Sequence, residues 1–267
     1  MTRLRAGEAE HMSDITRTAR LRIEPARRAR TRPEPALGPG RMASYIDRGF
    51  LVLADISGFT AFVTATELEH GPQIIAALLE AVMGQLSPPL EIQEVEGDAV
   101  FALGADRTLL PPGGLLGLFG NAFVAFRNRQ RELSEEPPIC SCTACERIST
   151  LSLKIVAHYG SFLRQTVGGR AQAAGSEVIL AHRLLKNRVN RRDGYLLLTD
   201  TARRRMGIDP TGAGWRAHTE RYEHLGDVPF LIGDVESVWA ETSPSGEMRC
   251  WDAPNPSNGE ARGRRLV

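Results

Sequence analysis

An apolar run that ends in a single carboxylate is the clearest feature of the hydrophobic pattern. Residues 51–53 (Leu-Val-Leu) show no polar alternation, which is typical of a strand buried on both faces of a sheet. Asp55 follows at the end of this run, and Gly58 turns the chain into a helical pattern. A carboxylate in that place is costly to desolvate unless a cation or the N-terminus of the next helix compensates its charge. The stretch therefore predicts either a cation ligand or a helix cap at Asp55.

A tight hairpin is predicted further along the chain, after two helical segments. The longer segment, residues 72–86, has apolar residues at spacings of three and four, which indicates a helix that faces a core. Residues 91–102 then contain a strand, a Gly97-Asp98 turn and a second strand. Two Asp side chains at neighbouring strand ends are the minimum for holding Mg²⁺ against a triphosphate. The hairpin therefore favours the cation interpretation of Asp55.

The pattern continues as an alternation of strands and helices up to residue 206. The predicted elements are a helix over 115–133, a strand over 149–158, a turn at Gly160, a partner strand over 161–167, a helix over 178–188, a strand over 194–198 and a short helix over 199–206. Residues 215–225 are a candidate strand extension to which we assign no chemistry. This order of elements predicts an α/β fold of the α+β kind with a ferredoxin-like core.

Composition and charge narrow the classes of partner. Of the 267 residues, 42% are hydrophobic, which is enough for a sizeable core and is typical of a soluble globular protein. No stretch approaches the roughly 20 apolar residues of a membrane span. The net charge of +1 conceals an asymmetry, because residues 1–41 contain ten Arg and five acidic residues and the remainder is therefore at −4. These features argue against a membrane and against nucleic acid as partners.

At the two Asp residues the chain resembles the class III nucleotide cyclases. The first metal-binding Asp of that family lies in a motif similar to Asp55-Ile-Ser-Gly-Phe-Thr60, and the second lies in a hairpin similar to Glu94-Val-Glu-Gly-Asp98. The two motifs in this order are a specific signal, whereas either motif alone is weak. The resemblance implies a ferredoxin-like cyclase domain with a mixed or antiparallel central sheet flanked by helices. It also implies a head-to-tail homodimer, and Mg²⁺ or Mn²⁺ held by Asp55, Ile56 and Asp98.

The resemblance extends in part to the residues that bind the nucleotide. Arg183 stands where the family has an Arg that stabilises the transition state, but Ile179 stands where an Asn is expected four residues earlier. Glu94 matches a position that reads the purine, and its usual Asp or Cys partner is replaced by Gln172. Lys154 opens a segment similar to the strand that follows the second Asp, and we count it among the nucleotide-binding candidates. The metal half of the implied site therefore matches better than the nucleotide half.

A cysteine-containing insertion over residues 135–148 is the second distinctive feature. The chain resembles an uncharacterised bacterial family of cyclase-like proteins that share this insertion, whose cysteines in this chain are Cys140, Cys142 and Cys145. Three thiolates supply most of a tetrahedral Zn²⁺ site or of an iron–sulfur centre. Cys250, His158 or a residue of a second subunit would complete it, although His158 lies on an apolar strand and is more typical of a core residue. Redox-active thiols and inert thiols are the alternatives, since a cytoplasmic setting disfavours a stable disulfide.

These observations leave two classes of function for a cyclase-like domain over residues 43–241. Residues 1–42 are expected to form a disordered Arg/Pro-rich tail, unless Met42 is the true start, and residues 242–267 are expected to form a loose C-terminal tail. One class is a purine nucleotide cyclase of low activity that acts in cytoplasmic signalling. The other class is a catalytically inactive sensor or binding module whose Cys cluster responds to metal or redox state.

Overall fold

The computed structural model describes six stretches of the chain: residues 44–66, 70–106, 113–135, 143–189, 194–212 and 214–234. The two predicted tails and the cysteines at positions 140, 142 and 250 lie outside these residues. The elements are, in chain order, β1 (Tyr45–Ser57), α1 (Phe59–Thr64), α2 (Gly71–Leu86), β2 (Glu91–Glu96), β3 (Ala99–Ala105), α3 (Gly114–Glu135), α4 (Thr143–Arg147), β4 (Ser152–Val167), β5 (Arg170–Ala174), α5 (Ser176–Leu185), β6 (Tyr195–Thr199), α6 (Asp200–Met206), β7 (Trp215–Tyr222) and β8 (Gly226–Gly233). A short 3-10 helix, Ile148–Thr150, precedes β4.

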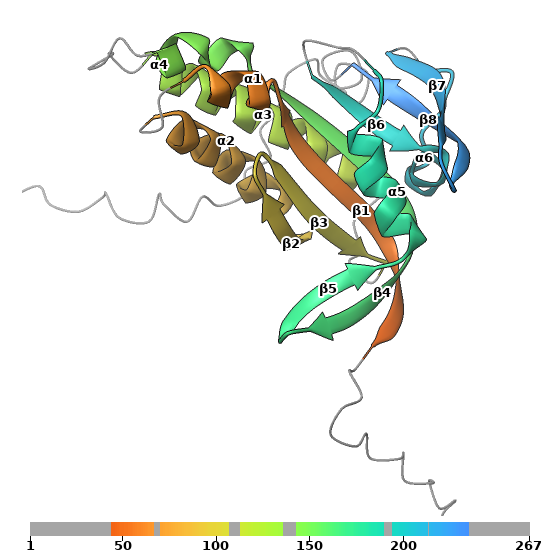
Figure 1. The fold of residues 1–267 in the computed structure, drawn as a ribbon. Coiled ribbons are helices and arrows are strands. Elements are labelled where there is room, and N and C mark those ends of the chain that lie inside the picture. Colours follow the sequence, from red (N-terminus) through yellow and green to blue (C-terminus); the bar gives the residue numbers. More distant parts are fainter. Residues whose placement is uncertain are drawn as a thin grey trace, which may run out of the picture. The chain divides into compact units, whose positions relative to one another are not determined.

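One 8-stranded sheet runs through this part of the molecule (Figure 1). The strand order is β2-β3-β1-β4-β6-β8-β7, and β5 pairs with β4 outside this path. All the pairings are antiparallel except that of β4 with β6, which is parallel. The central sheet flanked by helices confirms the predicted fold class. No helix of the described residues is long and apolar enough to cross a membrane.

Helices cover both faces of the sheet, and β1 supplies apolar residues to each face. Val52 and Ala54 pack with α1, α2, α3 and α4, whereas Leu51 and Leu53 pack on the side of α5. All four side chains are at most 1% exposed. Successive side chains of a strand point to opposite faces, so an unbroken apolar run is what a doubly covered strand requires. The predicted two-sided burial of this strand is confirmed, and the same alternation directs Asp55 toward the face that carries α5.

The predicted turn at Gly160 is wrong, because β4 continues through this residue as one strand of 16 residues. Gly160 lies opposite Gly49 in the antiparallel pairing with β1. The turn is instead made by Gly168 and Gly169, whose φ angles of 58° and 80° suit a two-residue hairpin. Glycine at position 160 instead leaves room for the Glu177 side chain, since a Cβ there would lie 2.7 Å from Cγ of Glu177. Beyond the turn, β5 returns along β4 as a two-stranded arm (Figure 1).

Candidate metal and nucleotide site

The two candidate metal ligands lie at the same end of adjacent strands. Asp55 is paired with Ala99 across β1 and β3, and Asp98 is the residue that precedes Ala99 in the hairpin turn. The backbone N–H of Ile56 donates a hydrogen bond of 3.1 Å to the carbonyl oxygen of Asp98. Burial raises the pKa of Asp98, and the negative charge of Asp55 raises it further. A cation between the two carboxylates would relieve this repulsion.

Lys154 already places one positive charge against this pair. It lies directly opposite Asp55 in the β1–β4 pairing, and its Nζ is 2.8 Å from Oδ2 of Asp55. The same Nζ donates a hydrogen bond of 2.7 Å to the carbonyl oxygen of Leu185, the last residue of α5. The Lys154 charge also opposes the rise in the pKa of Asp98. At this end of the sheet, the Lys154 ammonium therefore neutralises part of the negative charge of Asp55 and Asp98.

The oxygen ligands available at this site suit a Mg²⁺ or Mn²⁺ ion that is already bound to the phosphate oxygens of a nucleotide. Among the described residues there is no group of three or more His, Cys, Asp or Glu side chains that could hold a metal ion. Mg²⁺ is commonly held by one or two carboxylates together with substrate phosphates and water, rather than by a cage of protein ligands. The Ile56 side chain is buried in the core, so only its backbone carbonyl is available as a ligand. The residues present therefore fit a metal–triphosphate complex.

The helix with the predicted transition-state residues presents them to solvent. Ile179 is 55% exposed, and Arg183, one turn further along α5, is also exposed. The opposite side of α5 is buried through Ala181 and Leu184. Arg183 therefore points away from the core of its own chain.

The predicted purine-reading residues lie on two strands that contact each other, β2 and β5. Glu94 on β2 and Gln172 on β5 are both exposed. His182 of α5 packs edge-on against Phe101 of β3, with ring centroids 5.0 Å apart. Burial lowers the pKa of His182, and the negative charges of Glu94 and Glu96 oppose this shift. The structure therefore makes His182 a further candidate for the nucleotide site, within the electrostatic reach of Glu94.

His158 belongs to the core, as its apolar strand indicates. The residue is 2% exposed. Its Nδ1 lies 2.9 Å from Oγ1 of Thr199, and its Nε2 lies 2.5 Å from Oε2 of Glu177. With both ring nitrogens engaged, none is left for a metal ion. The network connects β4 to the first turn of α5 and to the N-terminus of α6, where Thr199 accepts a hydrogen bond from the N–H of Ala202.

Stability should fall on acidification because His158 is buried. Burial lowers its pKa and outweighs the opposite effect of the Glu177 carboxylate. As the pH drops through about 6.5, the unfolded chain takes up a proton that the folded chain resists, so folding becomes less favourable. We expect His158→Gln to cost about 1 to 3 kcal/mol at neutral pH through lost hydrogen bonds, and to lose less further stability between about pH 7.5 and 5.5 than the wild type does. Urea unfolding at the two pH values measures both effects.

His224→Gln is the control for this prediction, since the His224 side chain is 88% exposed. It should leave both the stability at neutral pH and its change on acidification as in the wild type. An equal loss on acidification in the wild type and in His158→Gln would contradict the assignment to His158.

Only one cysteine of the insertion lies in the described part of the chain. Cys145 is on α4 and is partly exposed, and α4 packs against the core through the fully buried Ala144. Cys140 and Cys142 lie outside the described residues. The convergence of three cysteines on a Zn²⁺ ion or an iron–sulfur centre therefore stays a prediction.

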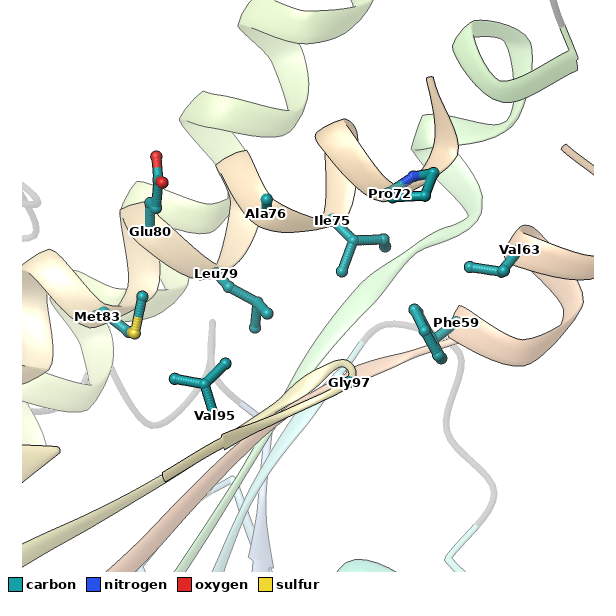
Figure 2. Close-up of a pocket in the computed structure, with 10 residues that line it drawn as sticks. All are labelled: Phe59, Val63, Pro72, Ile75, Ala76, Leu79, Glu80, Met83, Val95 and Gly97. Carbon is teal, nitrogen blue, oxygen red and sulfur yellow. The ribbon is translucent and has the colours of Figure 1, made fainter. Parts of the chain in front are cut away.

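An apolar groove of about 340 Å³ lies between α1, α2 and the β2–β3 hairpin. Figure 2 shows Phe59, Leu79 and Val95 along it. Among the described residues that line it, Glu80 is the only charged one. A triphosphate needs cations or a cluster of N–H donors, which this lining does not offer. The groove is therefore not a continuation of the carboxylate site, although both adjoin the hairpin turn.

Solved structures of nucleotide cyclases share this fold. The adenylyl cyclase CyaB from P. aeruginosa is 14% identical with a TM-score of 0.52, and the match covers 72% of this chain and 96% of that one. The guanylyl cyclase Cya2 is 14% identical with a TM-score of 0.53, and the match covers 72% of this chain and 94% of that one. The described body therefore has the fold of adenylyl and guanylyl cyclase domains.

Sequence relatives do not add an activity. Residues 75–194 match the model of a family described as a protein of unknown function (DUF2652). An uncharacterized protein of Mycobacterium tuberculosis, Rv2561/Rv2562, is 36% identical over 132 residues, which are 47% of this chain. The matched region spans 57% of the length of that relative.

Proposed function

We propose that this chain binds a purine nucleoside triphosphate together with Mg²⁺ or Mn²⁺ at Asp55 and Asp98, and converts it slowly to a 3′,5′-cyclic nucleotide. The observation that carries the proposal is the carboxylate pair at the ends of β1 and β3, in a cyclase fold and beside a partly buried lysine. The raised pKa of Asp98 is a sign that this pair gains from a bound cation.

Each candidate residue has a defined part in this reaction. The metal, when bound, supplies activation of the ribose 3′-hydroxyl and neutralises charge on the leaving pyrophosphate. Asp55 and Asp98 hold the complex, and the guanidinium of Arg183 stabilises charge that develops on the α-phosphoryl group. Glu94 and Gln172 face the purine. Ile179 offers no hydrogen bond, which is why we expect low turnover.

The direction of Arg183 favours a site shared by two copies of the chain. Within one chain Arg183 is exposed on α5, whereas Asp55 lies at a partly buried strand end. A head-to-tail homodimer would bring Arg183 of one subunit to the carboxylates of the other. Large apolar side chains are exposed at the start of β1 and on the arm formed by β4 and β5: Tyr45 at 51%, Ile46 at 79% and Val167 at 43%. Exposed apolar residues of this kind gain from burial in an interface.

The test is incubation of the purified full-length chain with ATP or GTP and Mn²⁺, with the product identified by mass. We expect a slow, Mn²⁺-dependent 3′,5′-cyclic product and measurable binding of the triphosphate. Absence of Mn²⁺-triphosphate binding at millimolar concentration would reject the proposal.

A cyclase-fold binding module without turnover is the second candidate, and the exposed Ile179 at a position for a polar donor favours it. Binding of Mn²⁺-triphosphate without any cyclic product would select this candidate. Elemental analysis of anaerobically purified protein would then test the Cys cluster. Bound zinc or iron would support a metal sensor, whereas the absence of both metals would support redox-active thiols.

A further inference from the structure

The Nζ atom of Lys154 contacts two partners from different parts of the fold. One is the Oδ2 atom of Asp55 at 2.8 Å, and the other is the carbonyl oxygen of Leu185 at 2.7 Å. Leu185 ends α5, where carbonyl groups lack helical partners and the helix dipole is negative. The side chains of Lys154 and Asp55 are only 12% and 18% exposed. Solvent therefore screens this ion pair less than a surface pair.

The tethered ammonium changes what the carboxylate pair offers to a metal ion. The two carboxylates alone have a net charge of −2, and together with the Lys154 ammonium the net charge of the group is −1. One oxygen of Asp55 is also already engaged by Nζ of Lys154. A divalent ion that arrives alone meets a positive charge fixed beside its ligand. Displacement of Lys154 is opposed by the second hydrogen bond, to Leu185.

A metal–triphosphate complex meets the opposite situation. Its phosphate oxygens bring negative charge, so the Lys154 ammonium attracts the complex although it repels the free ion. Lysine binds phosphate as a point charge and needs no particular geometry to do so. The Lys154 side chain thus opposes binding of the free divalent ion and favours binding of the metal–triphosphate complex.

We propose that Lys154 is a built-in competitor of free divalent cations, which makes the site select the metal–triphosphate complex over the free ion. This inference rests on the proposed function and assigns a ligand-selecting role to Lys154. It predicts that Mn²⁺ binds weakly alone and more tightly when a triphosphate is present. It also predicts that the difference depends on the positive charge at position 154.

The experiment is a Mn²⁺ titration of the full-length protein, with free Mn²⁺ followed by its electron paramagnetic resonance signal. The titration is done once without nucleotide and once with 3′-deoxy-ATP or 3′-deoxy-GTP, which lack the hydroxyl needed for cyclisation. Lys154→Met should bind free Mn²⁺ about tenfold more tightly than the wild type, because a nearby like charge has been removed. The gain in Mn²⁺ affinity on adding the analogue should shrink correspondingly.

Lys186→Met is the matched control, because Lys186 is an exposed lysine that follows Leu185 at the end of α5. It should bind free Mn²⁺ as the wild type does. Lys154→Arg keeps the cation and should also keep the weak binding of free Mn²⁺. Should Lys154→Met fail to fold in a thermal scan, Lys154→Gln, which retains a hydrogen-bond donor for Leu185, takes its place with the same expected result.

The outcomes separate this inference from the function on which it rests. If Mn²⁺ binds in a way that Asp55→Asn abolishes, but Lys154→Met and Lys154→Gln bind free Mn²⁺ no more tightly than the wild type, Lys154 is only a structural partner of Asp55. The inference is then wrong and the proposed function stands. If no variant shows Mn²⁺ binding that depends on Asp55, with or without the analogue, the proposed function itself fails.

Discussion

Asp55→Asn is expected to lower the affinity for Mn²⁺-triphosphate by about a hundredfold or more and to abolish turnover. The substitution keeps the size of the side chain but removes one of the two carboxylates that we propose hold the metal. It also removes the ion pair with Lys154, so the positive charge there is no longer neutralised. Calorimetric titration with Mn²⁺ and a 3′-deoxy triphosphate measures the affinity, and mass detection of cyclic product measures turnover.

Asp106→Asn is the matched control for this substitution. Asp106 follows β3 at its far end, where it accepts a hydrogen bond from the Tyr159 hydroxyl and pairs with Arg205. The side chain is half exposed, so we expect less than about 1 kcal/mol of lost stability and unchanged nucleotide binding. Retention of metal-dependent binding in Asp55→Asn would show that the triphosphate site lies elsewhere.

Ile179→Asn is expected to raise the rate of cyclisation by about a hundredfold with little change in apparent affinity. Removal of one donor that stabilises developing charge costs on the order of a hundred- to a thousandfold in rate, and adding the donor should recover much of this. A group that acts mainly in the transition state changes kcat more than ground-state binding. Ile179 is 55% exposed, so replacing it sacrifices little buried apolar area and the fold should tolerate Asn.

Ile179→Ala separates the new amide from the loss of the isoleucine side chain. It should leave the rate at the low level of the wild type. Steady-state kinetics with ATP and GTP distinguish kcat from KM for all three proteins. Brisk cyclisation by the wild type would mean that another group already supplies the hydrogen bond, and the reasoning about Ile179 would be wrong.

Local sequence determined the elements whose signals do not depend on distant partners. The unbroken apolar run before Asp55 specified a strand covered on both faces, because such a strand has no solvent-exposed side to mark with polar residues. The Gly97-Asp98 turn placed the second carboxylate, and the apolar stripes specified α2 and α3. The order of these elements was enough to predict that Asp55 and Asp98 come close.

Pairing between strands decided what local signals left ambiguous. Gly160 and the Gly168-Gly169 pair are both acceptable turns by composition, and the sheet used the second because β4 continues to pair with β1 through Gly160. Strand β8, which contains Pro229, was not predicted from the sequence, and proline is unfavourable inside a sheet. It is tolerated because the pairing with β6 covers only Phe230 to Gly233, so Pro229 has no neighbour on that side.

The residue types at the site follow from the sequence, but the charge balance of the site does not. Sequence related Asp55 to Asp98, but it identified Lys154 as a separate candidate with no relation to that pair. Only the antiparallel register of β1 and β4 places Lys154 opposite Asp55, and only the packing of α5 brings the Leu185 carbonyl to the same ammonium. Hydrogen bonds and ion pairs act over a few ångströms, whereas these partners lie far apart along the chain, so their meeting depends on how the whole sheet is assembled.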